Sequence, residues 1–531
     1  MVQTHISVVF LAGDLVYKIK KPVDLGFLDF TTLELRRIDC EDEVRLNRRL
    51  APSVYLGVVP IVRRRGGGLQ VGGDGPAIEY AVEMTRLPEE ATLRSRLARG
   101  ELEPDLLGTL ARRLADFHRR AASGPEVARW TRFEVVAGNA RENFEQTRQF
   151  RGQTVSAEVW SRLRGLTEAE LSRHRELIAV RARPGVARDT HGDLHLDHVY
   201  AFPGRRPPDD LVIVDCIEFN VRLRHADPVS DLAFLVMDLR FHHRSDLAEV
   251  LAHAYFDAAG DATGRALLPY YTAYRAVVRG KVESFALGAE EIPPGQRWQD
   301  LQRARAHFLL ALGELAPPPE RPCLVLVTGL PGTGKSHLAA GLAQRAGFDV
   351  VRSDAVRKEL AGLAPEESAA AAVNRGIYTP EWTERTYAVC LERAEERLFH
   401  GRRVVVDAGF REEARRREYL AAARAWGVPA RILVCTVPAE EAHRRLRDRA
   451  SSHRHHQEGD TRWGHLHEGG TSLGAGVDAS DADWTVYQAL AERWEDPAEE
   501  TASVVDRIDT TGPPEASLGQ ALAALRAAGL A

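Results

Sequence analysis

The sequence has few cysteines, and their arrangement excludes a disulfide-stabilised or cysteine-ligated metal protein. Only five occur in 531 residues, at Cys40, Cys216, Cys323, Cys390 and Cys435. No pair has the spacing of a metal-binding motif or of a disulfide framework. Because an odd number of isolated cysteines is typical of a reducing compartment, we expect a cytoplasmic protein.

Long hydrophobic runs and a large charge of one sign are also missing from the sequence. No stretch approaches the roughly 18 apolar residues that a membrane-spanning helix needs. The first apolar segment is interrupted by Asp14, which argues against a signal peptide. The 71 basic and 76 acidic residues give a net charge of −5. We therefore expect no membrane partner, and the charge disfavours nucleic acid as a partner.

Lysine is scarce, and the few lysines are unevenly placed. Only six of the 71 basic residues are lysines; three of them are Lys18, Lys20 and Lys21, and a fourth, Lys335, lies in a glycine-rich loop. Chance clustering is one interpretation. The other is that these positions require a compact ammonium group instead of a planar guanidinium.

A proline-rich stretch at residues 316–322 divides the chain. Four prolines in seven residues predict an extended, stiff linker. Before it, residues 1–88 have a β-rich pattern and residues 89–315 a mainly helical one, which predicts a two-lobed α+β domain. After it, residues 323–531 alternate short apolar strands with helices, which predicts an α/β domain with a parallel sheet covered on both faces.

Apolar periodicity places the individual elements. In the first part we expect a hairpin at 6–11 and 15–19, a helix at about 32–50, strands at 54–62, 77–84 and 211–214, and helices at 102–121, 133–150 and 158–180. In the second part we expect strands at 324–328, 350–352, 404–407, 432–437 and 504–508.

The strongest motif follows the linker, where residues 329–336 read GLPGTGKS and fit the pattern G-x-x-x-x-G-K-[ST] between a predicted strand and a predicted helix. Its glycines let backbone N–H groups surround phosphate oxygens at a helix N-terminus. Lys335 is expected to bridge the outer phosphates, and Ser336 to hold Mg²⁺. The predicted nucleotide-binding residues are Gly329, Gly332, Thr333, Gly334, Lys335 and Ser336.

Residues after the following strands suggest what this phosphate loop does. Asp354, just past the second strand, is a candidate general base, and Arg357 a candidate acceptor-binding residue; a helix cap is the alternative for Asp354. Asp407 ends the third strand and is a candidate Mg²⁺ ligand through water, or a cap. Arg445 and Arg449 share a helix face and are candidate lid residues, although a merely solvated face is the alternative.

Together, the phosphate loop, the Ser353-Asp354-x-x-Arg357 element, Val-Val-Val-Asp407 and Arg445-Leu-x-x-Arg449 resemble the P-loop kinases of small molecules and polynucleotide ends. The resemblance covers about residues 322–515. It implies that Asp354 is the general base and that the lid arginines contact phosphates.

A second candidate site precedes the linker. Residues 191–198 read HGDLHLDH, and Asp215 ends the next predicted strand. An acidic loop residue suits a base that faces a substrate hydroxyl, and a carboxylate after a strand suits nucleotide-bound Mg²⁺. This part resembles the aminoglycoside phosphotransferase family, with Asp193 in the catalytic loop, Asp215 as the metal aspartate, and Asp227 and Asp231 as caps of the following helix.

The resemblance extends to the start of the chain. The segments 17–22 (YKIKKP), 26–30 (GFLDF) and 47–51 (NRRLA) are similar to those of a branch in which such a domain is fused to a P-loop kinase. Lys18 and Lys20 point to the same side of a strand. We expect Lys18 to contact the α- and β-phosphates and to pair with Glu43 on the following helix, with a surface position as the alternative for Glu43.

One position departs from the family pattern. An asparagine is expected five residues after the catalytic aspartate, but His198 stands there. Imidazole is a poor ligand for Mg²⁺, which prefers oxygen. Three interpretations remain open for the site: a single metal ion, recruitment of Asp197, or nucleotide binding without efficient turnover. His198 is kept as a candidate metal ligand.

The leading hypothesis is an ATP-dependent phosphotransferase with two nucleotide-binding modules, which uses Mg²⁺ and transfers the γ-phosphoryl group to a hydroxyl of a small molecule. In a second hypothesis the first module is a nucleotide or ligand sensor that regulates the P-loop module. A third is a nucleic-acid 5′-end kinase, against which the acidic balance counts.

Overall fold

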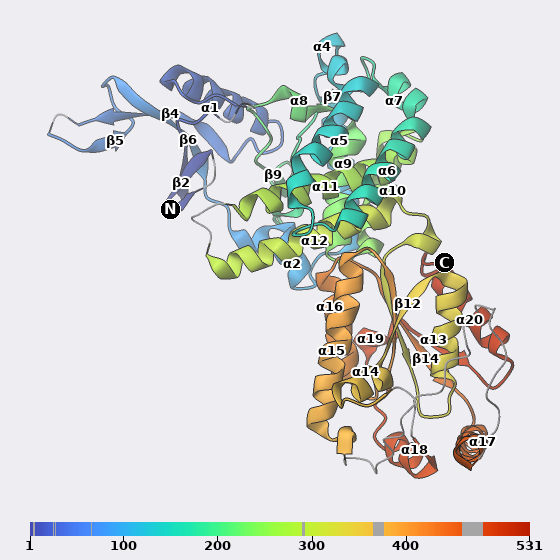
Figure 1. The fold of residues 1–531 in the computed structure, drawn as a ribbon. Coiled ribbons are helices and arrows are strands. Elements are labelled where there is room, and N and C mark those ends of the chain that lie inside the picture. The colour runs from blue at the N-terminus through green and yellow to red at the C-terminus, as the bar shows by residue number, and fades with distance from the viewer. Residues whose placement is uncertain are drawn as a thin grey trace. The chain divides into compact units, whose positions relative to one another are not determined.

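The computed structural model describes residues 1–3, 6–24, 26, 28–64, 66–288, 293–364, 376–458 and 482–531 (Figure 1). By packing, the chain forms two compact units. The first comprises Met1–Gln146 and Arg164–Val278, and the second comprises Thr147–Leu163 and Arg279–Ala531. The boundary between the units therefore differs from the proline-rich stretch. Residues 147–163 and the segment that begins at Arg279 precede that stretch but belong to the second unit.

The first unit opens with a six-stranded antiparallel sheet in the order β1-β2-β3-β6-β4-β5. The predicted hairpin is confirmed: β2 pairs with β3 across a turn in which Gly13 has a positive φ of 63°. Helix α1 (Leu33–Asn47) begins where the Thr32 side chain accepts a hydrogen bond from the Leu35 N–H. The strands are Val2–Gln3 (β1), Ser7–Ala12 (β2), Leu15–Lys20 (β3), Tyr55–Arg63 (β4), Leu69–Val71 (β5) and Ala77–Thr85 (β6).

A buried ion network joins this sheet to α1. The Lys20 ammonium lies 2.8 Å from Asp39 Oδ2 and 2.6 Å from Glu43 Oε2, and it also contacts Glu218 Oε1. Carboxylates that leave water together repel one another and lose solvation. Burial therefore raises the pKa of Glu218 from 4.5 to about 7.

The rest of the first unit is mainly helical. Helix α9 (Pro228–Phe241) is buried over most of its length. Where one helix was predicted at 158–180, there are two, α6 (Ala157–Arg173) and α7 (Arg175–Arg181), because the chain turns at His174. The other elements are α2 (Leu93–Ala98), α3 (Pro104–Arg120), α4 (Pro125–Ala128), α5 (Phe133–Thr147), β7 (Arg188–Asp189), β8 (Val199–Ala201), β9 (Leu211–Ile213), α8 (Val221–Arg224), β10 (His225–Ala226), α10 (Ser245–Ala259) and α11 (Leu268–Ala286).

Helix α9 fixes the loop that carries Asp193. The predicted cap at Asp227 is confirmed, since its carboxylate accepts from the Val229 N–H at 3.0 Å. Asp231 does not cap the helix as predicted. Its buried carboxylate instead accepts from the backbone N–H groups of His191 at 2.6 Å and Gly192 at 2.9 Å. These bonds hold the loop in one conformation.

The second unit contains a five-stranded parallel sheet in the order β12-β13-β11-β14-β15. Helices α13 (Lys335–Ala346) and α20 (Pro514–Ala527) cover one face, and α15 (Pro380–Phe399) and α16 (Glu413–Ala425) cover the other (Figure 1). All five predicted strands are confirmed: Cys323–Thr328 (β11), Phe348–Arg352 (β12), Arg403–Asp407 (β13), Ala430–Thr436 (β14) and Val505–Asp509 (β15). The remaining helices are α14 (Ser353–Leu360), α17 (Ala439–Glu458), α18 (Trp484–Ala491) and α19 (Glu499–Ala502).

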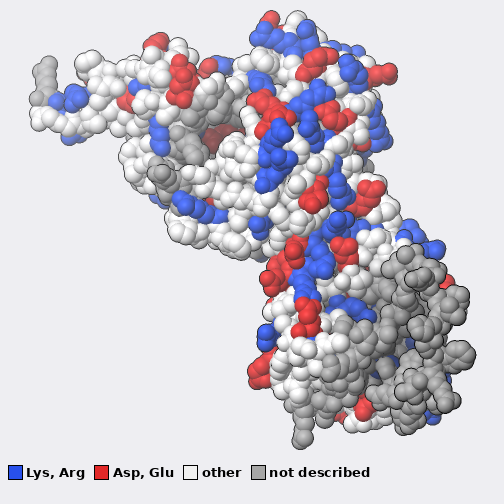
Figure 2. Space-filling model, in the orientation of Figure 1, with Lys and Arg blue, Asp and Glu red and all other residues white. Residues whose placement is uncertain are grey.

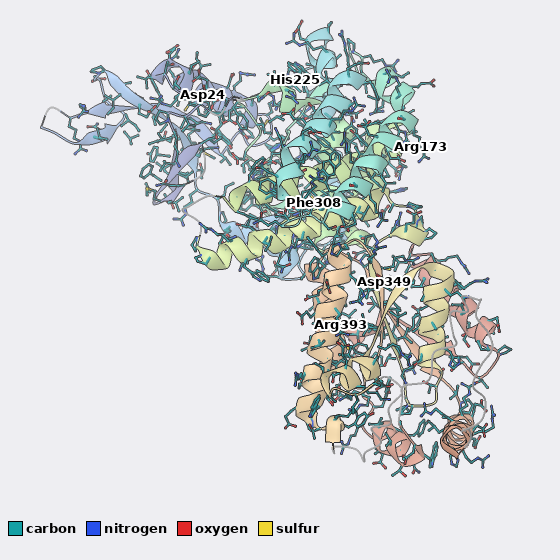
Figure 3. The ribbon with its side chains drawn as sticks, viewed as in Figure 1. Asp24, Arg173, His225, Phe308, Asp349 and Arg393 are labelled. Carbon is teal, nitrogen blue, oxygen red and sulfur yellow. The ribbon has the colours of Figure 1, made fainter. Side chains whose placement is uncertain are left out.

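The proline-rich stretch is not extended throughout. Pro318–Glu320 form a 3₁₀ turn, and the Glu320 carbonyl accepts a hydrogen bond from Arg162 at 3.1 Å. Helix α12 (Pro294–Leu315) also packs within the second unit. Its Phe308, labelled in Figure 3, lies against Gly280 of α11. The contact is so close that a Cβ added at Gly280 would lie 3.0 Å from the Phe308 ring. The expectation of a stiff, extended spacer is therefore wrong at residues 318–320.

All five cysteines are buried and free of disulfides. Among the described residues, no helix combines the length and the hydropathy that crossing a bilayer demands.

The Glu218 carboxyl makes the first unit pH-sensitive. The unfolded chain releases this proton near pH 4.5 and the folded chain near pH 7, so the folded state loses stability as pH rises between those values. We expect Glu218→Gln to remove this pH-dependent loss of folding stability, which is on the order of 3 kcal/mol. The measurement is native-state hydrogen exchange at β3 and α1 amides at pH 5 and 7.5. The matched control is Glu41→Gln on the exposed face of α1, in which stability should change with pH as it does in the wild type. If stability in Glu218→Gln still falls with pH as in the wild type, Glu218 is not the group responsible.

Gly192 tests the rigidity of the Asp193 loop. Its φ is +89°, and an added Cβ would lie 3.1 Å from the Leu223 carbonyl oxygen and 3.2 Å from Ile217 Cδ1. Gly185 has a similar φ of +93° with open space around it. We expect Gly192→Ala to lower the free energy of unfolding by about 1–3 kcal/mol more than Gly185→Ala, as measured by urea denaturation. An equal fall in the free energy of unfolding in both variants would mean that the loop can shift to accept the added methyl group and is not rigid.

Candidate active sites

Lys18 in strand β3 connects three segments of the first unit. Its ammonium lies 2.9 Å from Glu43 Oε1 on α1 and 2.8 Å from Asp215 Oδ1, just after β9. The predicted pair of Lys18 with Glu43 is thus confirmed, and Glu43 also binds Lys20 through its other oxygen. The Lys18 ammonium holds the pKa of the Asp215 carboxyl below its usual range, so this carboxyl is ionised.

The backbone around Asp215 is held by residues that sequence reasoning missed as site residues. Asp215 has a positive φ of 65°, which a non-glycine residue adopts only when its surroundings support it. The Tyr55 hydroxyl accepts from the Asp215 N–H at 3.1 Å, and Asn47 Oδ1 accepts from the Cys216 N–H at 2.8 Å. The position of Asn47, four residues after Glu43 on the same helix face, was the only available signal.

His198 lies between Asp193 and Asp215, and His195 packs beside it. His198 Nδ1 lies 2.8 Å from the Asp193 carbonyl oxygen, and His198 Nε2 lies 3.5 Å from Asp215 Oδ2. The His195 ring packs on the His198 ring with 3.8 Å between centroids, and its Nε2 lies 3.7 Å from Asp193 Oδ2. His195 Nδ1 in turn lies 3.4 Å from Asp197. The structure therefore brings the other four predicted site residues of this unit together near Asp215: Lys18, Glu43, Asp193 and His198.

The donor set of this first site does not fit Mg²⁺ well. Burial lowers the pKa of His198, which favours a neutral ring. A neutral imidazole offers nitrogen where Mg²⁺ prefers oxygen. Asp215 supplies an oxygen that would suit Mg²⁺, but His198 does not.

The phosphate loop of the second unit lies between β11 and α13. Gly329, Gly332 and Gly334 all have positive φ, at 141°, 76° and 83°. A Cβ at Gly329 would lie 2.6 Å from the Cys435 carbonyl oxygen, so this position requires glycine. The Lys335 ammonium donates to the Leu330 carbonyl at 2.9 Å. The loop therefore curls around its own lysine at the N-terminus of α13, where an anion is favoured.

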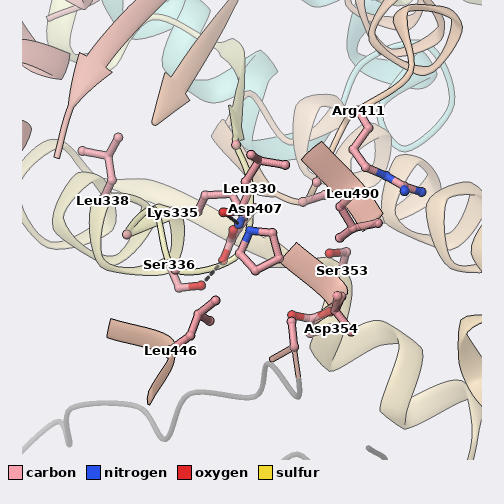
Figure 4. A pocket seen from close by; sticks show the side chains of 18 of the residues that line it. Leu330, Lys335, Ser336, Leu338, Ser353, Asp354, Asp407, Arg411, Leu446 and Leu490 are labelled. Atoms are coloured by element: carbon pink, nitrogen blue, oxygen red, sulfur yellow. Dashed lines mark hydrogen bonds between the residues drawn. The ribbon is translucent and has the colours of Figure 1, made fainter. Parts of the chain in front are cut away.

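A cavity of about 880 Å³ opens above this loop (Figure 4). The structure places nearly all predicted residues of the second site along its wall: Gly329, Gly332, Gly334, Lys335, Ser336, Asp354, Arg357, Asp407, Arg445 and Arg449. Thr333 is buried instead, and its hydroxyl donates to the Leu330 carbonyl at 2.8 Å. Among the described lining residues, six lysine and arginine side chains face four carboxylates, which suits a phosphorylated ligand.

Ser336 and Asp407 meet at the edge of the sheet. The Ser336 hydroxyl donates to Asp407 Oδ2 at 2.7 Å, the contact drawn in Figure 4. Arg352, which sequence reasoning missed, lies 3.6 Å from the same oxygen. A hydroxyl and a carboxylate are oxygen donors of the kind that Mg²⁺ prefers. The residues of this second site therefore have the donor chemistry that Mg²⁺ requires.

Asp354 and Arg357 both belong to α14. Burial, and next the nearby Asp407 carboxylate, raise the pKa of Asp354, which makes it a stronger base than an exposed aspartate. The buried Arg357 guanidinium donates to the Ile377 carbonyl at 2.9 Å and lies over the Tyr378 ring. Both side chains line the same cavity as Lys335.

The candidate lid arginines are held by backbone carbonyls. Arg445 donates to the Thr510 carbonyl at 2.7 Å and to Glu441 at 2.6 Å. Arg449 donates to the Ala482 carbonyl at 2.5 Å. Their guanidinium groups are thus positioned on α17 at the cavity wall, and neither belongs to a merely solvated face.

Two family models match separate parts of the chain. The model of the Phosphotransferase enzyme family matches residues 29–269, and an AAA domain model matches residues 324–463. Among solved structures, the GDP complex of aminoglycoside 2′-phosphotransferase-IIIa is 15% identical, with a TM-score of 0.36, and covers 58% of this chain and 91% of its own. A gluconokinase from Sinorhizobium meliloti 1021 is 18% identical, with a TM-score of 0.26, and covers 40% and 95%.

The whole chain also has full-length relatives. Uncharacterized proteins of Mycobacterium tuberculosis (strain ATCC 25618 / H37Rv) and Mycobacterium bovis are each 31% identical to it over 524 residues, which cover 98% of this chain and 94% of theirs. The chain therefore belongs to the family of these mycobacterial proteins, and in this chain an aminoglycoside phosphotransferase-like domain is followed by a P-loop kinase-like domain.

Proposed function

We infer that the protein is an ATP-dependent kinase with two nucleotide-binding units, each of which transfers the γ-phosphoryl group of ATP to a hydroxyl of a small molecule. The observation that carries this inference is the cavity in which Lys335, the Ser336–Asp407 pair and Asp354 converge. Phosphoryl transfer needs little covalent help from the protein, and positioning and charge neutralisation provide most of the catalysis.

In the second unit, each side chain has a role that follows from its place. Backbone N–H groups at the start of α13 would hold the phosphates, and Lys335 would exchange the Leu330 carbonyl for a phosphate oxygen. Ser336 and Asp407 would hold Mg²⁺, which supplies positive charge to the transferring group when bound. Asp354 would accept the proton of the attacking hydroxyl, and Arg357 would position the acceptor.

In the first unit, Lys18 would bind the α- and β-phosphates while Glu43 keeps its ammonium in place. Asp193 would accept the acceptor's proton, on a loop whose backbone is fixed by Asp231. No step through Mg²⁺ is assigned here, because His198 does not fit that ion.

The cavity size and surface charge favour a small acceptor. A cavity of about 880 Å³ has room for a nucleotide and a compact second molecule. On the face drawn in Figure 2, lysine and arginine side chains are interspersed with acidic ones. A nucleic-acid track needs a basic stripe, and the coloured residues of this face form none. The net charge of −5 likewise makes nucleic acid the less favoured acceptor.

His198 favours a second candidate function, in which the first unit binds nucleotide without efficient turnover and regulates the P-loop unit. The same ring that disfavours Mg²⁺ also lies over the catalytic loop, close to Asp193.

Asp193→Asn and Lys335→Ala separate these possibilities. If both units transfer phosphate, each variant should lose one of two ADP-producing activities by a factor on the order of 10²–10³. The measurement is ADP release by the full chain during a screen of hydroxyl compounds, with each variant compared with wild type.

The matched controls are Asp257→Asn on α10 and Arg345→Ala on α13, both at exposed positions outside the sites. They should keep wild-type rates. Loss in Lys335→Ala alone would favour the regulatory function of the first unit. Wild-type rates in both site variants would refute the proposed function.

A further inference from the structure

The orientation of His198 determines which of its ring nitrogens is free to bind a cation. Nδ1 lies 2.8 Å from the Asp193 carbonyl oxygen, and a carbonyl can only accept a hydrogen bond. Nδ1 therefore carries the proton of the neutral ring. Nε2 is left with its lone pair and faces Asp215 Oδ2 at 3.5 Å.

The other oxygen of Asp215 is already engaged, since Oδ1 accepts from Lys18 at 2.8 Å. His198 Nε2 and Asp215 Oδ2 thus face each other as two donor atoms, an arrangement that positive charge between them stabilises, whether a metal ion or a proton on Nε2. Metal–nitrogen and metal–oxygen bonds of about 2.1 Å would span this 3.5 Å gap at an angle of about 110°. The two atoms therefore have the spacing of a metal-binding pair.

We propose that the first unit binds its nucleotide with a divalent first-row transition-metal ion in preference to Mg²⁺, coordinated by His198 Nε2 and Asp215 Oδ2. Imidazole suits such ions, whereas Mg²⁺ selects oxygen. The proposal rests on the proposed nucleotide-binding function of this unit.

Phosphate oxygens of the nucleotide and water would complete the coordination. Asp193 lies on the other side of the ring, with its Oδ2 3.8 Å from His198 Nδ1. His195 is packed against the His198 ring, which limits how far either imidazole can turn. The second unit differs, because its predicted metal ligands, Ser336 and Asp407, are both oxygen donors. The two sites should therefore have different metal preferences within one chain.

The test is pulsed electron paramagnetic resonance of Mn²⁺ bound with ADP to the full chain. Protein labelled with ¹⁵N is compared with unlabelled protein, both with unlabelled ADP, so that a protein nitrogen on the metal is distinguished from a nucleotide nitrogen. We expect a directly coordinated protein nitrogen in wild type and its loss in His198→Asn. His253→Asn, at an exposed position on α10, is the matched control and should keep the signal.

Titration calorimetry gives a second readout of the same variants. The preference of the first site for Zn²⁺ over Mg²⁺, both with ADP, should fall on the order of tenfold in His198→Asn, since an amide oxygen replaces imidazole nitrogen. The wild-type labelling comparison decides the question even if that variant fails to fold.

The outcomes separate the metal preference of the first unit from its nucleotide binding. If the first unit binds ADP but the manganese spectrum contains no protein nitrogen, the metal assignment is overturned and the proposed function stands. If only one ADP binds per chain with either metal, and Lys335→Ala abolishes it, the nucleotide-binding function of the first unit fails as well.

Discussion

The first unit depends on one ammonium group held between two carboxylates. Lys18 comes from a strand, Glu43 from a helix and Asp215 from a loop almost 200 residues later, and their contacts of 2.9 and 2.8 Å join these segments. Removing one partner from such a buried set leaves an uncompensated charge, which is costly. The Lys20 network beside it repeats the arrangement with three carboxylates and carries the excess negative charge. The sheet, α1 and the Asp215 loop therefore have to come together in folding, so that no buried charge is left without a partner.

In the second unit, backbone geometry brings distant site residues together. A parallel sheet brings the carboxyl ends of β11, β12 and β13 to one edge, so Lys335, Asp354 and Asp407 meet although they are far apart in sequence. Three glycines with positive φ let the loop turn tightly enough for its lysine to fold back on it. Here the parallel sheet and the glycine-rich loop position the site residues, and few charged pairs are needed to keep them together.

Local pattern predicted most of the fold, and much of the grouping of site residues, from the sequence. The five strands of the second unit follow from short apolar runs between helical patterns, and the Lys18–Glu43 pair follows from strand alternation and helix periodicity. What the sequence left undetermined depends on contacts between distant segments. The turn at His174, the 3₁₀ turn at Pro318–Glu320, and Asp231 binding the 191–192 backbone instead of capping α9 are tertiary outcomes that no local period encodes. The same holds for Tyr55 and Arg352, whose partners lie more than 50 residues away.

The two lysines imply different energetics of nucleotide binding. Lys335 donates to a neutral carbonyl and can exchange it for a phosphate oxygen without leaving a buried charge behind. Lys18 is bound to two carboxylates, and charge-assisted bonds of this kind are about twice as strong as neutral ones. Turning Lys18 toward a phosphate withdraws positive charge from Asp215, a cost that a dication on Oδ2 would offset. It follows that metal and nucleotide should bind cooperatively in the first unit, whereas the second unit lacks this reason for coupling.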